Sequence, residues 1–314
     1  MLNRRYLRIK VMQALYGFFQ ADDADMVKSE RELLRSVDKV FNLYIYLLLF
    51  FEELQRLALL QMEEGRNKML PTKEDLNPNL RFISNRVIKQ LAADPKLKRE
   101  GEARKLSWQV DGDVVRKVWS AVKSWDAYAK YMSSPEDSYE QDRDFLVDLF
   151  AKHVADSDFV ELHIEEKSLY WPGDLNMCVG AAIIRTLEAA KENSPPRLMA
   201  LYKDPEDDRR FLLELFRKTI LDRERTQSLI GEKTQNWEVE RIAAMDIMLM
   251  KMAVTELLHF SEVPVKVTLN EYIEISKLYS TPKSSIFING ILDKLVADFR
   301  KDGTMVKTGR GLME

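Results

Sequence analysis

The sequence predicts an all-α protein built as a helical bundle, and three observations lead to that expectation. Only 11 glycines and 10 prolines occur in 314 residues, and residues 1–70 and 206–263 contain no proline, so long helices can run there uninterrupted. Apolar residues recur at spacings of three and four along nearly the whole chain. No stretch shows the sustained two-residue alternation of a half-buried strand.

The individual helices follow from this periodicity, with proline-bearing segments as the loops between them. Thr268 followed by Glu271 has the spacing of a capping box, which predicts a helix start at Thr268. The expected helices span residues 4–20, 26–66, 79–92, 112–132, 138–160, 174–192, 207–231, 236–260, 268–279 and 284–301.

The expected organisation is an enlarged helical N-terminal region over 1–205, a C-terminal helical domain over 206–303 and a flexible tail over 304–314. The N-terminal region contains the basic first helix, the long second helix, an insertion, and a segment over 138–192 that resembles part of the C-terminal domain.

That resemblance is an internal repeat. At an offset of 66 residues, 12 of the 30 positions in 142–171 are identical to those in 208–237, without a gap. Two amphipathic helices that converge on one apolar stripe would explain the Phe and Leu matches. They would not explain the match of Trp171 to Trp237. We therefore predict a duplication in which 138–192 and 207–260 form related helical halves, with the two tryptophans in equivalent places.

Composition limits the classes of function. With 48 basic and 51 acidic residues the net charge is −3, so any nucleic-acid footprint must be local. The single cysteine, Cys178, excludes an internal disulfide and every multi-cysteine metal site, as is typical of a reducing cytoplasm. The longest apolar run, 41–51, is well short of the roughly 18 residues of a membrane span. We expect a soluble cytoplasmic protein.

Signals for catalysis are weak. The only Gly-x-Gly, at 309–311, follows no strand, so a dinucleotide site lacks support. His163 and Glu165 form a His-x-Glu pair, but a zinc deaminase also needs a two-cysteine motif that one cysteine cannot supply. His153 and its neighbouring acids fit a solvated helix end, and Cys178 fits a packed helix. The sequence predicts no enzyme, no catalytic residue, no cofactor and no metal.

The first helix stands out by its charge. Residues 1–21 contain four basic residues and no acid. Leu7, Val11 and Phe18 lie on an inward stripe, and the polar residues lie beside it. Arginine binds phosphate, glutamine reads base edges and tyrosine stacks on unpaired bases. Either this is an ordinary solvated face or it binds RNA through side chains that include Arg4, Arg5, Arg8, Gln13 and Tyr16.

The C-terminal third contains a specific series of motifs. Val254-Thr255-Glu256-Leu257-Leu258 precedes Val263-Pro264-Val265-Lys266-Val267-Thr268-Leu269-Asn270-Glu271, and Phe287-Ile288-Asn289-Gly290-Ile291-Leu292-Asp293 follows. Together with Arg8 and Val11-Met12-Gln13-Ala14-Leu15-Tyr16, this series resembles the NusB family of bacterial transcription antitermination factors. The resemblance covers residues 3–20 and about 206–300. The stretch 21–205 has no counterpart in the short form of the family, although 142–192 can be a duplicated copy.

The resemblance implies a NusB-like all-helical fold and a non-enzymatic function. It implies pairing with a small-subunit ribosomal protein, NusE, and binding of the single-stranded boxA element in nascent transcripts, notably ribosomal RNA. The elongation complex with other Nus factors is the implied setting. Glu256 carries over as a partner contact and Phe287 as an RNA-side aromatic. Lys283 stands where the family usually has an acid, and a cation there favours phosphate.

Two other classes of function remain open. NusB-like domains also serve ribosomal-RNA processing or methylation, although the chain lacks a glycine-rich cofactor loop. A purely structural interaction protein would instead use 21–205 as its binding surface.

Overall fold

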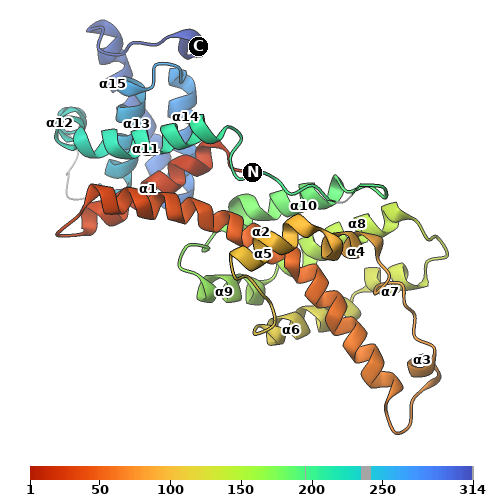
Figure 1. Cartoon of the computed structure of the whole chain (residues 1–314). Coiled ribbons are helices and arrows are strands. Elements are labelled where there is room, and N and C mark those ends of the chain that lie inside the picture. The colour runs from red at the N-terminus through yellow and green to blue at the C-terminus, as the bar shows by residue number, and fades with distance from the viewer. Residues whose placement is uncertain (195, 235–241, 313–314) are drawn as a thin grey trace. The chain divides into compact units, whose positions relative to one another are not determined.

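The computed structural model describes residues 1–194, 196–234 and 242–312, and these residues form helices and no β-strand (Figure 1). The all-α prediction is confirmed. The chain divides into two compact units. Unit 1 comprises Met1 and residues 36–201, and unit 2 comprises residues 2–35 and 202–314.

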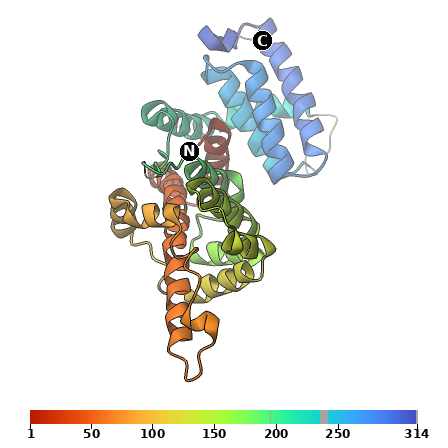
Figure 2. The same ribbon diagram turned by 90° about the vertical axis from the view of Figure 1, so that its right-hand side faces the viewer.

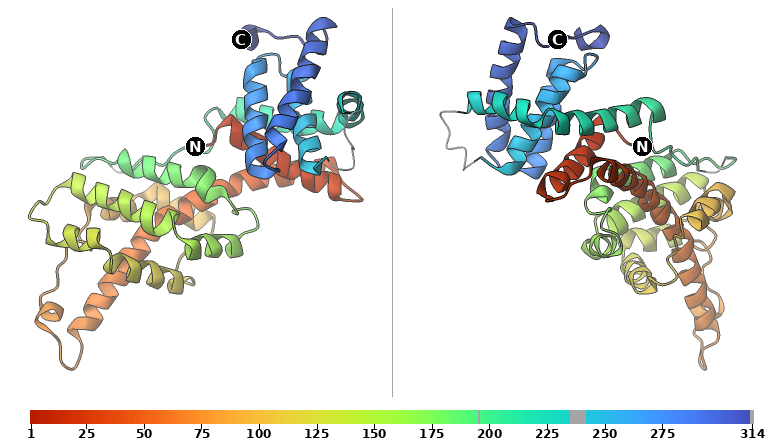
Figure 3. Two further views of the ribbon diagram at one scale, coloured as in Figure 1. Left: turned by 180° about the vertical axis from the view of Figure 1, so that it is seen from behind. Right: turned by 60° about the vertical axis from the view of Figure 1, so that its left-hand side comes forward.

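Unit 2 is built from the first helix and the C-terminal helices. Its elements are α1 (Arg4–Gln20), α11 (Pro205–Leu221), α12 (Arg223–Lys233), α13 (Ala244–His259), α14 (Val265–Tyr279), α15 (Ser284–Lys301) and the 3₁₀ turn η4 (Gly309–Leu312). This division differs from the expected boundary after residue 205, because α1 packs against α11, α13 and α14 (Figure 3). Leu7, Val11 and Leu15 of α1 are fully buried in that packing.

The core of unit 2 is centred on α13. Helices α13, α14 and α15 contact one another side by side (Figure 2). Leu249, Met252 and Leu257 are buried completely, so the methionine-rich helix α13 forms the centre of this core.

Unit 1 surrounds the middle of the long helix α2 (Met26–Arg66), whose first residues belong to unit 2. The aromatic and aliphatic side chains of 43–51 are nearly all buried. Leu49 lies against Gly101, where an added Cβ would come within 3.0 Å of the leucine. The other helices are α3 (Lys73–Leu76), α4 (Arg86–Ala93), α5 (Pro95–Ala103), α6 (Gly112–Lys123), α7 (Asp126–Ser133), α8 (Tyr139–Phe150), α9 (Asp158–Lys167) and α10 (Gly180–Glu188), with π-helical turns η1 (Ala151–Ala155) and η2 (Leu175–Val179).

Most helix positions agree with the periodicity, and α1, α2 and α15 have the expected bounds. The expected helix over 79–92 begins only at Arg86, because the Asn85 side chain caps its first turn. Helix α5 was not expected, although Asp94 and Pro95 are a standard start signal and Asp94 does cap it. Residues 235–241 lie outside the described residues, so α13 is described from Ala244.

The predicted capping box at Thr268 is wrong. Helix α14 begins three residues earlier, at Val265 after Pro264. The Thr268 hydroxyl instead donates to Glu256 at 2.8 Å, and Glu271 accepts from Arg5. Both side chains bind other helices and not the backbone of their own.

The predicted duplication is supported by matching helix bounds. Helix α8 with η1 covers 139–155, and α11 covers 205–221, which is the same segment shifted by 66 residues. Helices α9 and α12 end at Lys167 and Lys233, which are also 66 residues apart. Trp171 is buried in unit 1, and Trp237 lies outside the described residues.

A shared polar anchor supports the duplication further. Asp142 and Asp208 are aligned in the repeat, and each is buried. Asp142 binds Arg86, which follows the capping Asn85, at 2.7 Å. Asp208 binds Arg4, which follows a capping asparagine at the start of α1, at 3.1 Å. The pair α4 and α8 therefore repeats the arrangement of α1 and α11.

Candidate nucleic-acid interface

Arg8 is buried in the interior of unit 2. Its side chain is 2% exposed and forms a two-point ion pair with Glu256, which is fully buried. The Arg8 Nε to Glu256 Oε2 distance is 2.7 Å, and the Nη2 to Oε1 distance is 2.6 Å. The expectation that Arg8 lies on the accessible surface is wrong, because a carboxylate on α13 allows the guanidinium to be buried.

Glu256 joins three helices. Besides Arg8 of α1, it accepts hydrogen bonds from Thr268 at 2.8 Å and Tyr272 at 3.1 Å, both on α14. Burial alone lowers the pKa of Arg8, but the Glu256 carboxylate outweighs it and raises the pKa above its ordinary value. Burial also raises the pKa of Tyr272. The expected exposure of Glu256 to a partner is therefore wrong in this structure, since its hydrogen bonds hold the bundle together.

Arg4 and Arg5 are partly exposed, but acids of the same unit pair with them. Arg4 binds Asp207 and, at 3.1 Å through Nε, Asp208. Arg5 donates to the two oxygens of Glu271 at 2.8 and 3.1 Å. The hydrogen bond to Glu271 raises the pKa of Arg5. An RNA phosphate would compete with these carboxylates for both arginines.

The other predicted RNA residues are more accessible. On α1, Gln13 is exposed and the Tyr16 ring is 45% exposed. Lys283 is exposed directly before α15, and Phe287 is half-buried in its first turns. Helices α1 and α15 both contact α13 and α14, so these side chains come from two sides of one bundle.

The start of α15 is held by a buried acid whose role the sequence did not predict. Asp246 of α13 accepts from the Ser280 hydroxyl at 2.5 Å and the Ser284 hydroxyl at 2.8 Å. The paired hydroxyls fix the turn that presents Lys283.

Three further residues of unit 2, which the sequence did not predict as a site, come together in the structure. Arg223 and Lys251 both lie over the ring of Phe19. The sequence feature that could have indicated this site is Lys251, a lone cation within the apolar sequence of α13.

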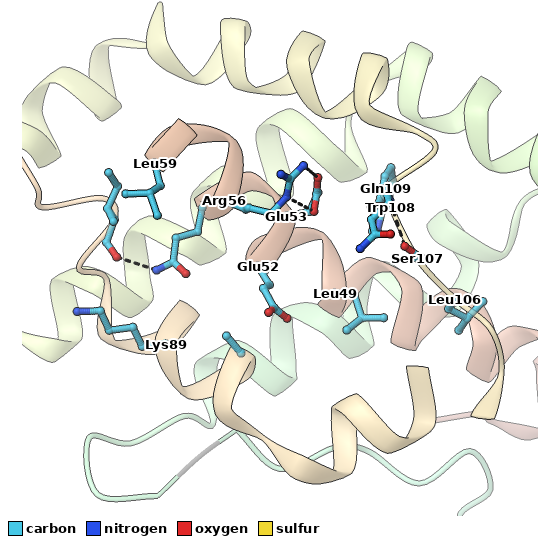
Figure 4. A pocket seen from close by; sticks show the side chains of 13 residues that line it. Leu49, Glu52, Glu53, Arg56, Leu59, Lys89, Leu106, Ser107, Trp108 and Gln109 are labelled. Atoms are coloured by element: carbon cyan, nitrogen blue, oxygen red, sulfur yellow. Dashed lines mark hydrogen bonds and ion pairs between the residues drawn. The ribbon is translucent and has the colours of Figure 1, made fainter. Parts of the chain in front are cut away.

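Unit 1 contains a cavity of about 480 Å³ between α2, α4 and the segment 106–109 (Figure 4). Figure 4 shows Glu52 pointing into it, beside the Glu53–Arg56 ion pair. Its lining residues include no histidine or cysteine. Elsewhere in unit 1, His163 contacts the Tyr46 hydroxyl at 2.9 Å, and Cys178 is buried.

The described residues lack two features that other classes of site require. Within 1–194, 196–234 and 242–312, no group of three or more His, Cys, Asp or Glu side chains is arranged to hold a metal ion. No helix in that part of the chain is long and apolar enough to cross a membrane.

Comparison with known proteins gives consistent matches. The NusB family model matches residues 181–297. The transcription antitermination protein NusB of Salinibacter ruber is 43% identical over 138 residues, which is 42% of this chain and 86% of the relative. The NusB proteins of Chloroherpeton thalassium and Syntrophotalea carbinolica are 40% identical over 104 residues and 42% identical over 87. Those matches span about half of each relative, 49% and 56%. No solved structure matches the chain.

Proposed function

The chain belongs to the NusB family, and we propose that it is a non-enzymatic transcription antitermination factor that binds single-stranded RNA in the cytoplasm. The observation that carries this proposal is the 43% identity over 86% of a protein named for antitermination. The RNA target is a boxA-type element of nascent transcripts, notably ribosomal RNA. The protein partner is the small-subunit ribosomal protein NusE, within an elongation complex that contains other Nus factors.

The RNA contacts that fit the structure best are Gln13, Tyr16, Lys283 and Phe287. Tyr16 and Phe287 offer rings to unstacked bases, and Lys283 offers a solvent-exposed charge directly before α15. Arg4 and Arg5 contribute phosphate contacts at the edge, by exchanging Asp207 and Glu271 for RNA. Arg8 stays inside the fold and supports α1.

The test is fluorescence anisotropy with a labelled boxA-type single strand and a scrambled control, with and without the ribosomal protein. Tyr16→Ala should weaken RNA binding by about 1–3 kcal/mol, the cost of one lost base stack. Thr308→Ala serves as the control, because Thr308 is an exposed residue near the C-terminus, and this variant should leave the RNA affinity unchanged. Equal affinity for boxA and scrambled RNA, with no increase when the ribosomal protein is added, would contradict the proposal.

A further inference from the structure

Two cations from different helices share one aromatic ring in unit 2. The Arg223 guanidinium carbon lies 5.8 Å from the centroid of Phe19, and the Lys251 ammonium lies 5.7 Å from the same centroid. Phe19 is near the end of α1, Arg223 is the first residue of α12 and Lys251 is in the middle of α13. Each contact is a cation–π attraction, and together they bring like charges close to each other.

Neither cation has an ion-pair partner among the described residues. This contrasts with the arginines at the start of α1, each of which pairs with an acid. Asp222, directly before Arg223, is bound by His259. Burial and then the neighbouring Arg223 charge lower the pKa of Lys251. An anion between the two side chains would remove this repulsion.

The position of Phe19 on α1 indicates which kind of anion would bind between the two cations. Gln13, Tyr16 and Phe19 follow one another at intervals of three, so they lie along one side of the helix. Tyr16 and Phe19 are separated by about 4.5 Å along the helix axis. The cation pair therefore continues the exposed polar and aromatic side of α1.

We propose that Arg223 and Lys251 form a phosphate-binding site for the backbone of single-stranded RNA whose base stacks on Tyr16. This inference rests on the proposed RNA-binding function and names residues that the arginine-rich start of α1 does not include. The guanidinium donates two hydrogen bonds to phosphate oxygens, and the ammonium supplies a point charge. RNA fits better than an acidic peptide because the exposed Tyr16 ring lies about one turn along α1 from Phe19, the ring that the two cations share, and can stack on a base.

The experiment measures RNA affinity against salt for the full chain, with Arg223→Gln, Lys251→Gln and the matched control Arg225→Gln. Arg225 is exposed on the same helix and is two residues from the site. Each site variant should weaken binding about 3- to 10-fold and reduce the log–log salt slope by about 0.7. Arg225→Gln should change neither quantity.

A thermal melt separates loss of the site from loss of the fold. Lys251→Gln removes a half-buried charge that faces Arg223, so its melting temperature should equal or exceed that of the original chain. If the original chain binds no RNA, the proposed function fails. If it binds RNA and both site variants keep its affinity and slope, the phosphate site fails while the function stands. Variants that lose only a protein partner would also overturn the RNA assignment.

Discussion

Removing the buried guanidinium of Arg8 should strongly destabilise unit 2. In Arg8→Met, the Glu256 carboxylate loses two of the four hydrogen bonds that it accepts and keeps those from Thr268 and Tyr272. A hydrogen bond to a charged group contributes about 1.5–3 kcal/mol, so two give about 3–6 kcal/mol. Breaking a buried ion pair from one side costs about 3–5 kcal/mol. Since the two ranges overlap, we expect a loss of about 3–5 kcal/mol in the free energy of unfolding.

The assay is hydrogen exchange of amides in α13 and α14 during urea titration, which reports unit 2 separately from unit 1. Arg5→Met is the matched control, because Arg5 is 41% exposed and its pair with Glu271 should contribute less than about 1 kcal/mol. The double variant Arg8→Met/Glu256→Leu should cost less than Arg8→Met alone, since no charge is left buried. A loss for Arg8→Met no larger than that for Arg5→Met would refute the buried-pair reasoning.

Three further outcomes are expected. The imidazoles of His153 and His163 should titrate below their ordinary pKa of about 6.5 in NMR, because burial disfavours the charged ring. Near pH 6.5 the unfolded chain then binds more protons than the folded chain, so the free energy of unfolding should fall as the pH drops below about 6.5. An NMR titration midpoint above about 6.5 for either histidine would contradict this prediction. Asp142→Asn and Asp208→Asn should each lower the free energy of unfolding of their own unit by about 1–3 kcal/mol in urea. No loss at one of the two sites would argue against equivalent roles for these residues in the duplication. Glu256→Lys should unfold unit 2 in circular dichroism; a folded variant that only loses its partner would restore Glu256 as a surface contact.

Much of the fold could be predicted because it depends on local signals. Helices α1, α2 and α15 begin and end where capping, proline and apolar spacing indicate. The burial of Arg8 could not be predicted from spacing, because its partner Glu256 is 248 positions away in the chain. A basic residue beside an apolar stripe looks solvated until the helix packed against it supplies a carboxylate. For the same reason Lys251 and Arg223 come together only in three dimensions.

The repeat shows what a sequence pattern can and cannot provide. Twelve identities predicted related segments, and the helix bounds at 139–155 and 205–221 agree with them. The paired roles of Arg86 and Arg4 were not predicted, because these residues lie outside the aligned segment. Their equivalence depends on which helix packs on α8 and which on α11, a tertiary property.

The sequence of unit 1 lies between those of α1 and α11, and this order along the chain determines which unit can fold first during translation. The ribosome makes α1 first, and all of residues 36–201 must follow before α11 emerges. At roughly 5–20 residues per second, that interval is on the order of ten seconds or more. Throughout this interval Leu7, Val11 and Leu15 have no completed core to enter, whereas unit 1 has its whole sequence as soon as residue 201 has been made. Because arginine is always ionised, Arg4, Arg5 and Arg8 keep this segment charged until the acids of unit 2 that pair with them have been made.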